Sequence, residues 1–207
     1  MTIPSHNLSS PSIAPAPFLA VGLGNPGRDY RSNRHNVGFM LLDRLAARLG
    51  LTFSRYQFKA LVTKGEYQQQ KLVLAKPQTF MNLSGQAVSA LVRFYKVPME
   101  NLLVVYDDVD LPLGTLRLRP AGGSAGQKGM TSIIEKLGIQ DFPRLRIGIG
   151  RPSGRMEAAA YVLQDFSTAE TELLSITLDR AVDAVLTFVT EGLTMAMNRY
   201  NTATNDQ

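Results

Sequence analysis

The chain contains no cysteine, and only two histidines occur among its 207 residues. The absence of cysteine excludes disulfides and cysteine chemistry, and it suits the reducing cytoplasm, where we expect the protein to reside. His6 lies in a Pro/Ser-rich segment, whereas His35 follows a glycine-rich turn at the start of an expected helix. Because imidazole is the side chain that exchanges protons most readily near neutral pH, acid–base chemistry in this chain would depend on His35.

Long hydrophobic runs and targeting signals are also missing. No apolar run approaches the roughly 18 residues that span a bilayer, so we expect no membrane segment. Residues 1–17 carry four prolines, four serines and no lysine or arginine, whereas a signal peptide begins with basic residues and a transit peptide is rich in arginine. We interpret residues 1–17 as a disordered extension, residues 18–200 as one domain and residues 201–207 as a C-terminal tail.

The net charge of +5 conceals an asymmetry along the chain. Residues 111–156 hold eight Lys/Arg residues against two acids, whereas residues 157–207 hold two against eight. The cations alternate with glycines and apolar residues, which is typical of a surface that contacts phosphate groups. A nucleic acid is therefore an expected partner, and charge alone does not distinguish RNA from DNA.

Apolar strands alternate with helical segments between residues 18 and 200. Leu102–Tyr106 is a continuous apolar run, as in a central strand that is buried on both faces. Apolar residues at four-residue spacing from Val37 to Leu49 predict a helix that ends at Gly50. The other expected elements are strands at 18–23, 58–67, 71–76, 115–119 and 144–150, a helix capped by Ser84, and helices at 127–137 and 168–197. This alternation predicts one α/β domain with a mixed, mostly parallel sheet.

Two short motifs match known signatures without the context that those signatures require. Gly22–Gly27 fits G-x-G-x-x-G, but Pro26 removes a backbone donor and the next helix begins several residues too late to hold a pyrophosphate. Gly122–Gly126 fits G-x-S-x-G, but a catalytic Ser124 needs a later histidine, and none follows residue 35. We therefore expect no nucleotide cofactor and no serine nucleophile.

Five blocks of the sequence together resemble the bacterial-type peptidyl-tRNA hydrolases, in that family's order and spacing. They are VGLGNPG with RHNVGF, KPQTFMNLSG, YDDVDLPLG, GGSAGQKGM and FPRLRIGIGRP. The resemblance covers residues 18 to about 200 and implies a single α/β domain, usually monomeric, with a twisted mixed sheet surrounded by helices. It also implies hydrolysis of the ester that links a peptide to the 3′-terminal ribose of tRNA, without cofactor or metal.

The same resemblance assigns three catalytic residues. His35 is the general base that takes a proton from the attacking water. Asp107 orients the imidazole and stabilises the imidazolium as it forms. Asn25 offers an amide to the peptide or to a developing oxyanion, and it helps to discriminate blocked from free aminoacyl-tRNA.

Five further positions are expected to hold substrate. Asn82 offers a second amide, and Tyr30 and Phe80 line the cleft, where they can stack on the terminal adenosine or on a side chain. Arg119 and Arg146 match family positions that hold tRNA phosphates, for which arginine supplies bidentate contacts. Recognition by charge and shape, without reading bases, suits an enzyme that serves every tRNA.

One loop departs from the family, which commonly has His-Asn where this chain has Gln127-Lys128. We expect Lys128 to bind substrate in place of the asparagine, through a contact with a phosphate or a carbonyl group. The alternative is that the site works with one amide fewer. Two other functions remain open: a non-catalytic RNA-binding relative, as in splicing factors that resemble this family, and a hydrolase of small carboxylic esters. The intact set of His35, Asp107, Asn25 and Asn82 favours the enzyme, and the cationic block argues against small esters.

Overall fold

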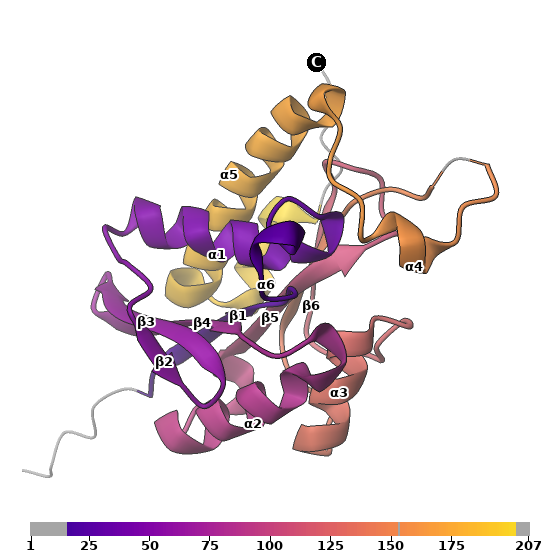
Figure 1. Ribbon diagram of the computed structural model, residues 1–207. Coiled ribbons are helices and arrows are strands. Elements are labelled where there is room, and N and C mark those ends of the chain that lie inside the picture. Colours follow the sequence, from indigo (N-terminus) through magenta and orange to yellow (C-terminus); the bar gives the residue numbers. More distant parts are fainter. Residues whose placement is uncertain (1–15, 153, 202–207) are drawn as a thin grey trace, which may run out of the picture.

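The computed structural model describes residues 16–152 and 154–201, which build one seven-stranded sheet with helices on both faces (Figure 1). The strands are β1 (Phe18–Gly22), β2 (Arg55–Gln57), β3 (Ala60–Tyr67), β4 (Gln70–Pro77), β5 (Leu102–Asp108), β6 (Leu116–Arg119) and β7 (Arg144–Gly148). The helices are α1 (Val37–Arg48), α2 (Ser84–Tyr95), α3 (Lys128–Leu137), α4 (Ala158–Tyr161), α5 (Thr168–Glu191) and α6 (Leu193–Tyr200).

The sheet has a parallel centre and antiparallel edges. Its strand order is β2-β3-β4-β1-β5-β7-β6. The pairs β4–β1, β1–β5 and β5–β7 are parallel, and the pairs β2–β3, β3–β4 and β6–β7 are antiparallel. Because β2 and β4 are both antiparallel to β3, β2 runs with the central strands, so only β3 and β6 run the opposite way. The prediction of a mixed, mostly parallel sheet is confirmed.

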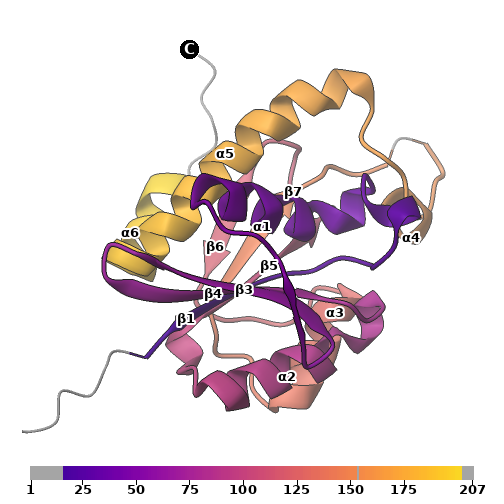
Figure 2. The ribbon, with the colours of Figure 1, turned by 60° about the vertical axis from the view of Figure 1, so that its left-hand side comes forward.

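The helices form two layers, one on each side of the sheet. Figures 1 and 2 show α1, α5 and α6 covering one face and α2 and α3 covering the other. β5 serves both cores, because Leu103 and Val105 pack toward the first layer and Leu102 and Val104 toward the second. All seven residues of β5 are buried, which confirms the predicted central strand. Among the described residues, no helix has the length and apolarity to cross a bilayer.

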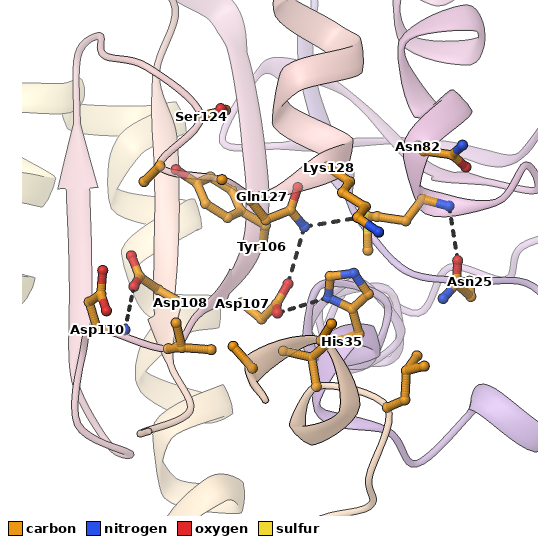
Figure 3. A pocket seen from close by; sticks show the side chains of 18 of the residues that line it. Asn25, His35, Asn82, Tyr106, Asp107, Asp108, Asp110, Ser124, Gln127 and Lys128 are labelled. Atoms are coloured by element: carbon orange, nitrogen blue, oxygen red, sulfur yellow. Dashed lines mark hydrogen bonds and ion pairs between the residues drawn. The ribbon is translucent and has the colours of Figure 1, made fainter. Parts of the chain in front are cut away.

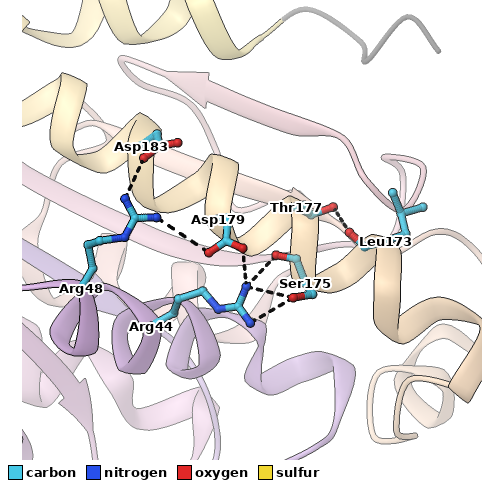
Figure 4. Close-up of polar contacts among 7 residues, drawn as sticks. All are labelled: Arg44, Arg48, Leu173, Ser175, Thr177, Asp179 and Asp183. Atoms are coloured by element: carbon cyan, nitrogen blue, oxygen red, sulfur yellow. Dashed lines mark hydrogen bonds and ion pairs between the residues drawn. The ribbon is translucent and has the colours of Figure 1, made fainter. Parts of the chain in front are cut away.

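Polar contacts join α1 to α5 along their exposed sides (Figure 4). Arg44 Nη1 donates to the Ser175 carbonyl at 2.7 Å and pairs with Asp179 Oδ2 at 2.9 Å. Arg48 pairs with Asp183 at 3.4 Å. Because exposed ion pairs contribute at most about 1 kcal/mol each, the buried apolar side chains between these helices dominate their packing.

Two glycines let α1 approach the sheet closely enough to place the functional loops. A Cβ atom on Gly38 would lie 2.5 Å from the Leu23 nitrogen and 2.6 Å from the Val105 carbonyl oxygen. A Cβ atom on Gly22 would lie 2.2 Å from the Gly38 oxygen. All three distances are too short for any side chain at these positions. The contact holds the 3₁₀ turn η2 (Arg34–Asn36), which directly precedes α1, against the ends of β1 and β5.

Several boundaries differ from the prediction. Ser84 was expected to cap α2, but it is the first helical residue, and its buried hydroxyl donates to the Met81 carbonyl of the preceding 3₁₀ turn η3 (Met81–Leu83) at 2.9 Å. The expected helix at 168–197 is divided at Gly192, whose φ of 86° interrupts the helical backbone.

Most residues of the two expected flanking segments lie outside the part of the chain that the structure describes. The predicted extension lies outside the described residues except for 16 and 17, and so does the predicted tail except for Asn201. Asn201 accepts from the Leu118 backbone nitrogen at 2.6 Å and donates to the Leu118 carbonyl at 3.1 Å. These bonds pair the outer edge of β6 with a side chain, so residue 201 belongs to the folded domain.

Candidate active site

A cleft of about 590 Å³ opens at the carboxyl ends of the central strands, where ligands bind in open α/β sheets. The loop after β1 supplies Asn25, and β5 with its following loop supplies residues 107–110. η2 supplies His35, η3 and the residue before it supply residues 80–82, and the glycine-rich loop before α3 supplies residues 124–128. α4 and the residues after it complete the rim. Figure 3 shows these side chains converging from six segments of the chain.

The structure brings His35 and Asp107 into direct contact. His35 Nδ1 lies 2.8 Å from Asp107 Oδ2, and the two side chains are 11% and 3% exposed. An ionised carboxylate only accepts hydrogen bonds, so Nδ1 carries the proton and Nε2 holds the free lone pair. The His35 backbone nitrogen donates to the Val162 carbonyl at 2.8 Å, which fixes the residue on the rim that follows α4. In Figure 3 the second ring nitrogen points away from Asp107 into the cleft.

Gln127 holds the other oxygen of Asp107. Its Nε2 donates to Asp107 Oδ1 at 3.2 Å, and its Oε1 accepts from the Met130 backbone nitrogen at 2.8 Å. Because a backbone N–H can only donate, this second bond fixes the amide orientation and directs the NH₂ group at Asp107. Gln127 is thus both the N-cap of α3 and a partner of the carboxylate.

Asn25 is held rigidly with one donor free. Its Oδ1 accepts from the Met81 backbone nitrogen at 2.9 Å, which leaves its Nδ2 as the group available to the cleft. Asn36 clamps the Asn25 backbone by accepting from its nitrogen and donating to its carbonyl, both at 2.9 Å. Both asparagines are nearly buried, with 8% and 2% of their surfaces exposed. In Figure 3 the free amide lies on the side of Asn25 that faces His35.

Three predicted substrate-binding residues lie on the rim of the same cleft, namely Phe80, Asn82 and Lys128. All three are exposed, and the Phe80 ring is 59% accessible. Lys128 is the first residue of α3. The N-terminus of a helix carries positive potential and attracts anions, and it is an unfavourable place for a cation. The lysine at this position therefore adds its charge to a potential that is already positive.

The structure does not bring Tyr30 into the cleft. Tyr30 lies in the 3₁₀ turn η1 (Arg28–Tyr30), and it is not among the residues that line the cleft. Its ring packs over Gly27 instead, within 3.6 Å of the place where a Cβ atom would stand. The expectation that Tyr30 holds substrate therefore stays a prediction, and this residue stands apart from the residues that line the cleft.

Arg119 and Arg146 lie beside the cleft rather than in it. Strand register places Arg117 opposite Arg146 and Arg119 opposite Arg144, so four arginines share the sheet face toward α3. Arg119 is exposed at the end of β6, whereas Arg146 pairs with Asp108, which does line the cleft.

Arg144 is a structural anchor that the sequence analysis did not identify. It is 1% exposed and donates to the carbonyls of Gly122, Gly123 and Gln140 at 2.5, 3.1 and 2.7 Å. Burial lowers the pKa of this guanidinium, and it raises the pKa of the neighbouring Tyr106 phenol. The anchor holds the glycine-rich loop that delivers residues 127 and 128 to the cleft.

Within 16–152 and 154–201, no three His, Asp or Glu side chains gather where they could share a metal ion. Sequence reasoning missed the contacts of Gln127, Asn36 and Arg144. The available signal was position: Gln127 is the first residue of the expected helix, and Asn36 directly follows His35.

Comparisons with known proteins agree with this geometry. The family model described as peptidyl-tRNA hydrolase matches residues 19–207. The chain is 49% identical over 201 residues to a chloroplastic peptidyl-tRNA hydrolase of Arabidopsis thaliana, covering 97% of this chain and 69% of that protein. It is 53% identical over 185 residues to a peptidyl-tRNA hydrolase of Chloroflexus aggregans, covering 89% and 98%.

A solved structure gives the same result. The crystal structure of peptidyl-tRNA hydrolase from Acinetobacter baumannii superposes with a TM-score of 0.85 at 34% identity, covering 91% of this chain and 96% of that one. Family model, relatives and fold all extend over most of the chain. The chain therefore belongs to the peptidyl-tRNA hydrolase family, and it is an enzyme that hydrolyses peptidyl-tRNA.

Proposed function

We propose that His35 is the general base for hydrolysis of the ester between the peptide and the 3′-terminal ribose. This hydrolysis releases the tRNA for reuse. The observation that carries this proposal is the 2.8 Å contact between His35 Nδ1 and Asp107 Oδ2 inside the cleft. It leaves Nε2 free to accept a proton from water as the water oxygen attacks the ester carbonyl. The imidazolium then returns this proton to the ribose oxygen as the ester bond breaks, so the base is regenerated.

Two side chains support this proton transfer. Asp107 keeps the proton on Nδ1 and stabilises the imidazolium electrostatically. Gln127 fixes the second carboxylate oxygen, so Asp107 cannot rotate away from His35 without losing a hydrogen bond to each. Gln127 acts through Asp107 and is a positioning residue.

Asn25 supplies a donor for the charge that develops on the carbonyl oxygen. Its Nδ2 is free, and its orientation is held by Met81 and by the Asn36 clamp. A donor fixed before the reaction stabilises an oxyanion without reorganisation, which is the usual basis of such stabilisation. The same neutral amide favours a peptide amide over a charged α-amino group, because the charged group would lose solvation there.

The rim residues bind the two parts of the substrate. Phe80 offers an exposed ring for stacking, and Asn82 offers a donor and an acceptor for a peptide backbone. Lys128, at the N-terminus of α3, takes a phosphate or carbonyl oxygen in place of the family's asparagine. Arg119 and Arg146, on the adjoining face of β6 and β7, hold tRNA phosphates.

The protein works as a monomer in a cytoplasmic compartment. The residues assigned to the site converge on one cleft within a single chain, so a monomer carries the full set. The absence of cysteine is compatible with a reducing compartment.

Replacement of His35 by alanine tests the mechanism. We expect His35→Ala to lower kcat on peptidyl-tRNA at least about a hundredfold, the low end for loss of a general base. Substrate affinity and the thermal unfolding midpoint should change little, because the contact with Asp107 lies in a cleft that water can enter. Near-normal hydrolysis by the folded variant would exclude His35 as the base.

A further inference from the structure

A second cationic region lies on the other side of the cleft from β6 and β7. Residues 51–98 contain seven Lys/Arg residues and a single acid, Glu66. They form β2, β3, β4 and α2, at the opposite end of the strand order from the arginines of β6 and β7. None of these cations has been given a role above.

Six of these seven cations are exposed and belong to none of the ion pairs of the described residues, and four of the six lie on the surface considered next. Within the described part of the chain, no ion pair includes Arg55, Lys59, Lys64 or Arg93. Lys59 donates instead to the neutral Gln86 amide at 2.8 Å. Their positive charge is therefore available to an external anion, unlike that of Lys76, which pairs with Asp43.

Aromatic rings stand among these cations. Phe58 and Phe94 are 40% and 54% exposed, and their ring centroids lie 4.9 Å apart. Lys64 Nζ lies 4.6 Å from the centroid of Tyr95, which is itself in edge contact with Phe94. We call the surface formed by Arg55, Phe58, Lys59, Lys64, Arg93 and Phe94 the aromatic–basic patch.

The β3 strand offers an internal comparison that shows Phe58 is not required by its turn. Phe58 and Lys59 form the two-residue turn before β3, with φ of 49° and 61°. Gln68 and Gln69 form the turn after β3 with nearly the same values, 46° and 67°. Since a polar pair fills the same geometry at the other end of the strand, the exposed phenylalanine needs another explanation.

The patch continues into the cleft. The Gln78 nitrogen donates to the Lys59 carbonyl at 2.7 Å, and Phe80 and Asn82 on the rim follow within four residues. The Lys59 ammonium also donates to the side chain of Gln86, which lies in the first turn of α2, four residues after Asn82. The aromatic–basic patch therefore adjoins the rim of the cleft.

We propose that the aromatic–basic patch binds the RNA part of the substrate tRNA. The free cations contact phosphates, and Phe58 with Phe94 provides a platform for an unstacked base, as in surfaces that bind single-stranded RNA. Charge selects the occupant: a surface with several free cations and a single nearby acid, Glu66, attracts a polyanion, and the substrate of this enzyme supplies one. The inference rests on the proposed reaction at His35, because it requires the 3′ end to occupy the cleft.

Binding of deacylated tRNA to the full chain tests the proposal. The variants are Arg55→Gln with Arg93→Gln, and separately Phe58→Gln, which copies the residue found in the second turn. Gln68→Glu with Gln69→Glu is the matched control, because it lowers the net charge by the same two units at the far end of β3. Affinity is measured by fluorescence anisotropy between about 50 and 200 mM salt, the range in which phosphate contacts change it most.

The expected results differ between the variants. The double arginine variant should bind tRNA several-fold more weakly, and the slope of log affinity against log salt should fall by about 1.4, or roughly 0.7 for each phosphate contact. Phe58→Gln should weaken binding about fivefold without changing that slope, because stacking releases no counterions. The control should stay within about twofold. Unchanged affinity and slope in both patch variants would overturn the proposal.

Hydrolysis assays separate the RNA from other occupants. On full-length peptidyl-tRNA the patch variants should raise KM and leave kcat unchanged, while on the same peptide esterified to a CCA trinucleotide they should match the parent. Equal losses on both substrates, or a loss that follows peptide length, would overturn an RNA patch. Failure of the mechanism at His35 is distinguishable, because His35→Ala is tested by kcat on either substrate and not by tRNA binding.

Discussion

Gln127→Glu reverses one hydrogen bond at the centre of the site while preserving side-chain size. The glutamine amide donates to Asp107 at 3.2 Å and accepts from the Met130 nitrogen at 2.8 Å. A glutamate keeps the second bond, because its carboxylate still caps α3 and suits the positive end of the helix. The first bond becomes a contact between two carboxylate oxygens.

The size of the effect follows from that distance. Two unit charges 3.2 Å apart repel by about 5 kcal/mol at an effective dielectric of about 20. The introduced carboxyl and Asp107 therefore share a proton, and the pKa of one of them rises well above the ordinary carboxyl range. Below the raised pKa the protonated carboxyl donates to Asp107 as the amide does, and above it the pair repels and His35 loses its orientation.

The assay is the ratio of kcat for the variant to kcat for the parent between about pH 5.5 and 8.5. We expect the ratio to fall at least about tenfold as pH rises, since one pK unit corresponds to about 1.4 kcal/mol. The free energy of unfolding of the variant should change with pH in the same direction. A carboxyl whose pKa is raised in the folded state leaves the protein stable at low pH, and stability is lost as pH rises through the raised pKa.

Gln127→Leu is the control, because it removes both bonds and should lower kcat by a factor that does not depend on pH. It should also cost about 1 kcal/mol of stability through the lost cap. A constant ratio for Gln127→Glu across the whole range would refute a role for Gln127 in holding Asp107.

Two further predictions concern the substrate contacts. Lys128→Asn should retain activity within about tenfold, or roughly 1.4 kcal/mol of barrier, while Lys128→Glu should be much worse at low salt, because it repels the tRNA phosphates; parent-like activity of Lys128→Glu at low salt would show that Lys128 makes no such contact. Arg119→Ala with Arg146→Ala should weaken tRNA binding and reduce its salt dependence by roughly one counterion per phosphate contact, and an unchanged slope in a filter-binding titration would remove both from the phosphate site.

Much of the fold was predictable, because hydrophobic periodicity depends on local burial. The continuous run at 102–106 identified the central strand, and Asp107 directly follows that run. The scarcity of histidine singled out His35, and the resemblance to a known family gave it the role of general base. What the sequence could not show was how each amide is turned, since that depends on partners far along the chain, such as the Met81 nitrogen for Asn25.

The unpredicted features have physical reasons of their own. Glutamine is not among the preferred N-cap residues, so the link from α3 through Gln127 to Asp107 carries no clear local signal. Arginine is rarely buried, and Arg144 is buried only because carbonyls of a distant loop accept its hydrogen bonds. The packing of the Tyr30 ring over Gly27 had no signal in the sequence either, because it depends on the local turn geometry.

The central claim is that His35 and Asp107 act as one catalytic unit, and a double-mutant cycle on kcat tests it most directly. His35→Ala and Asp107→Asn should each lower single-turnover hydrolysis of peptidyl-tRNA by at least about a hundredfold. The double variant should be little slower than His35→Ala alone, because residues that act as a unit are not additive. A double variant that loses the product of the two single effects would show that the two residues act independently and would contradict the account.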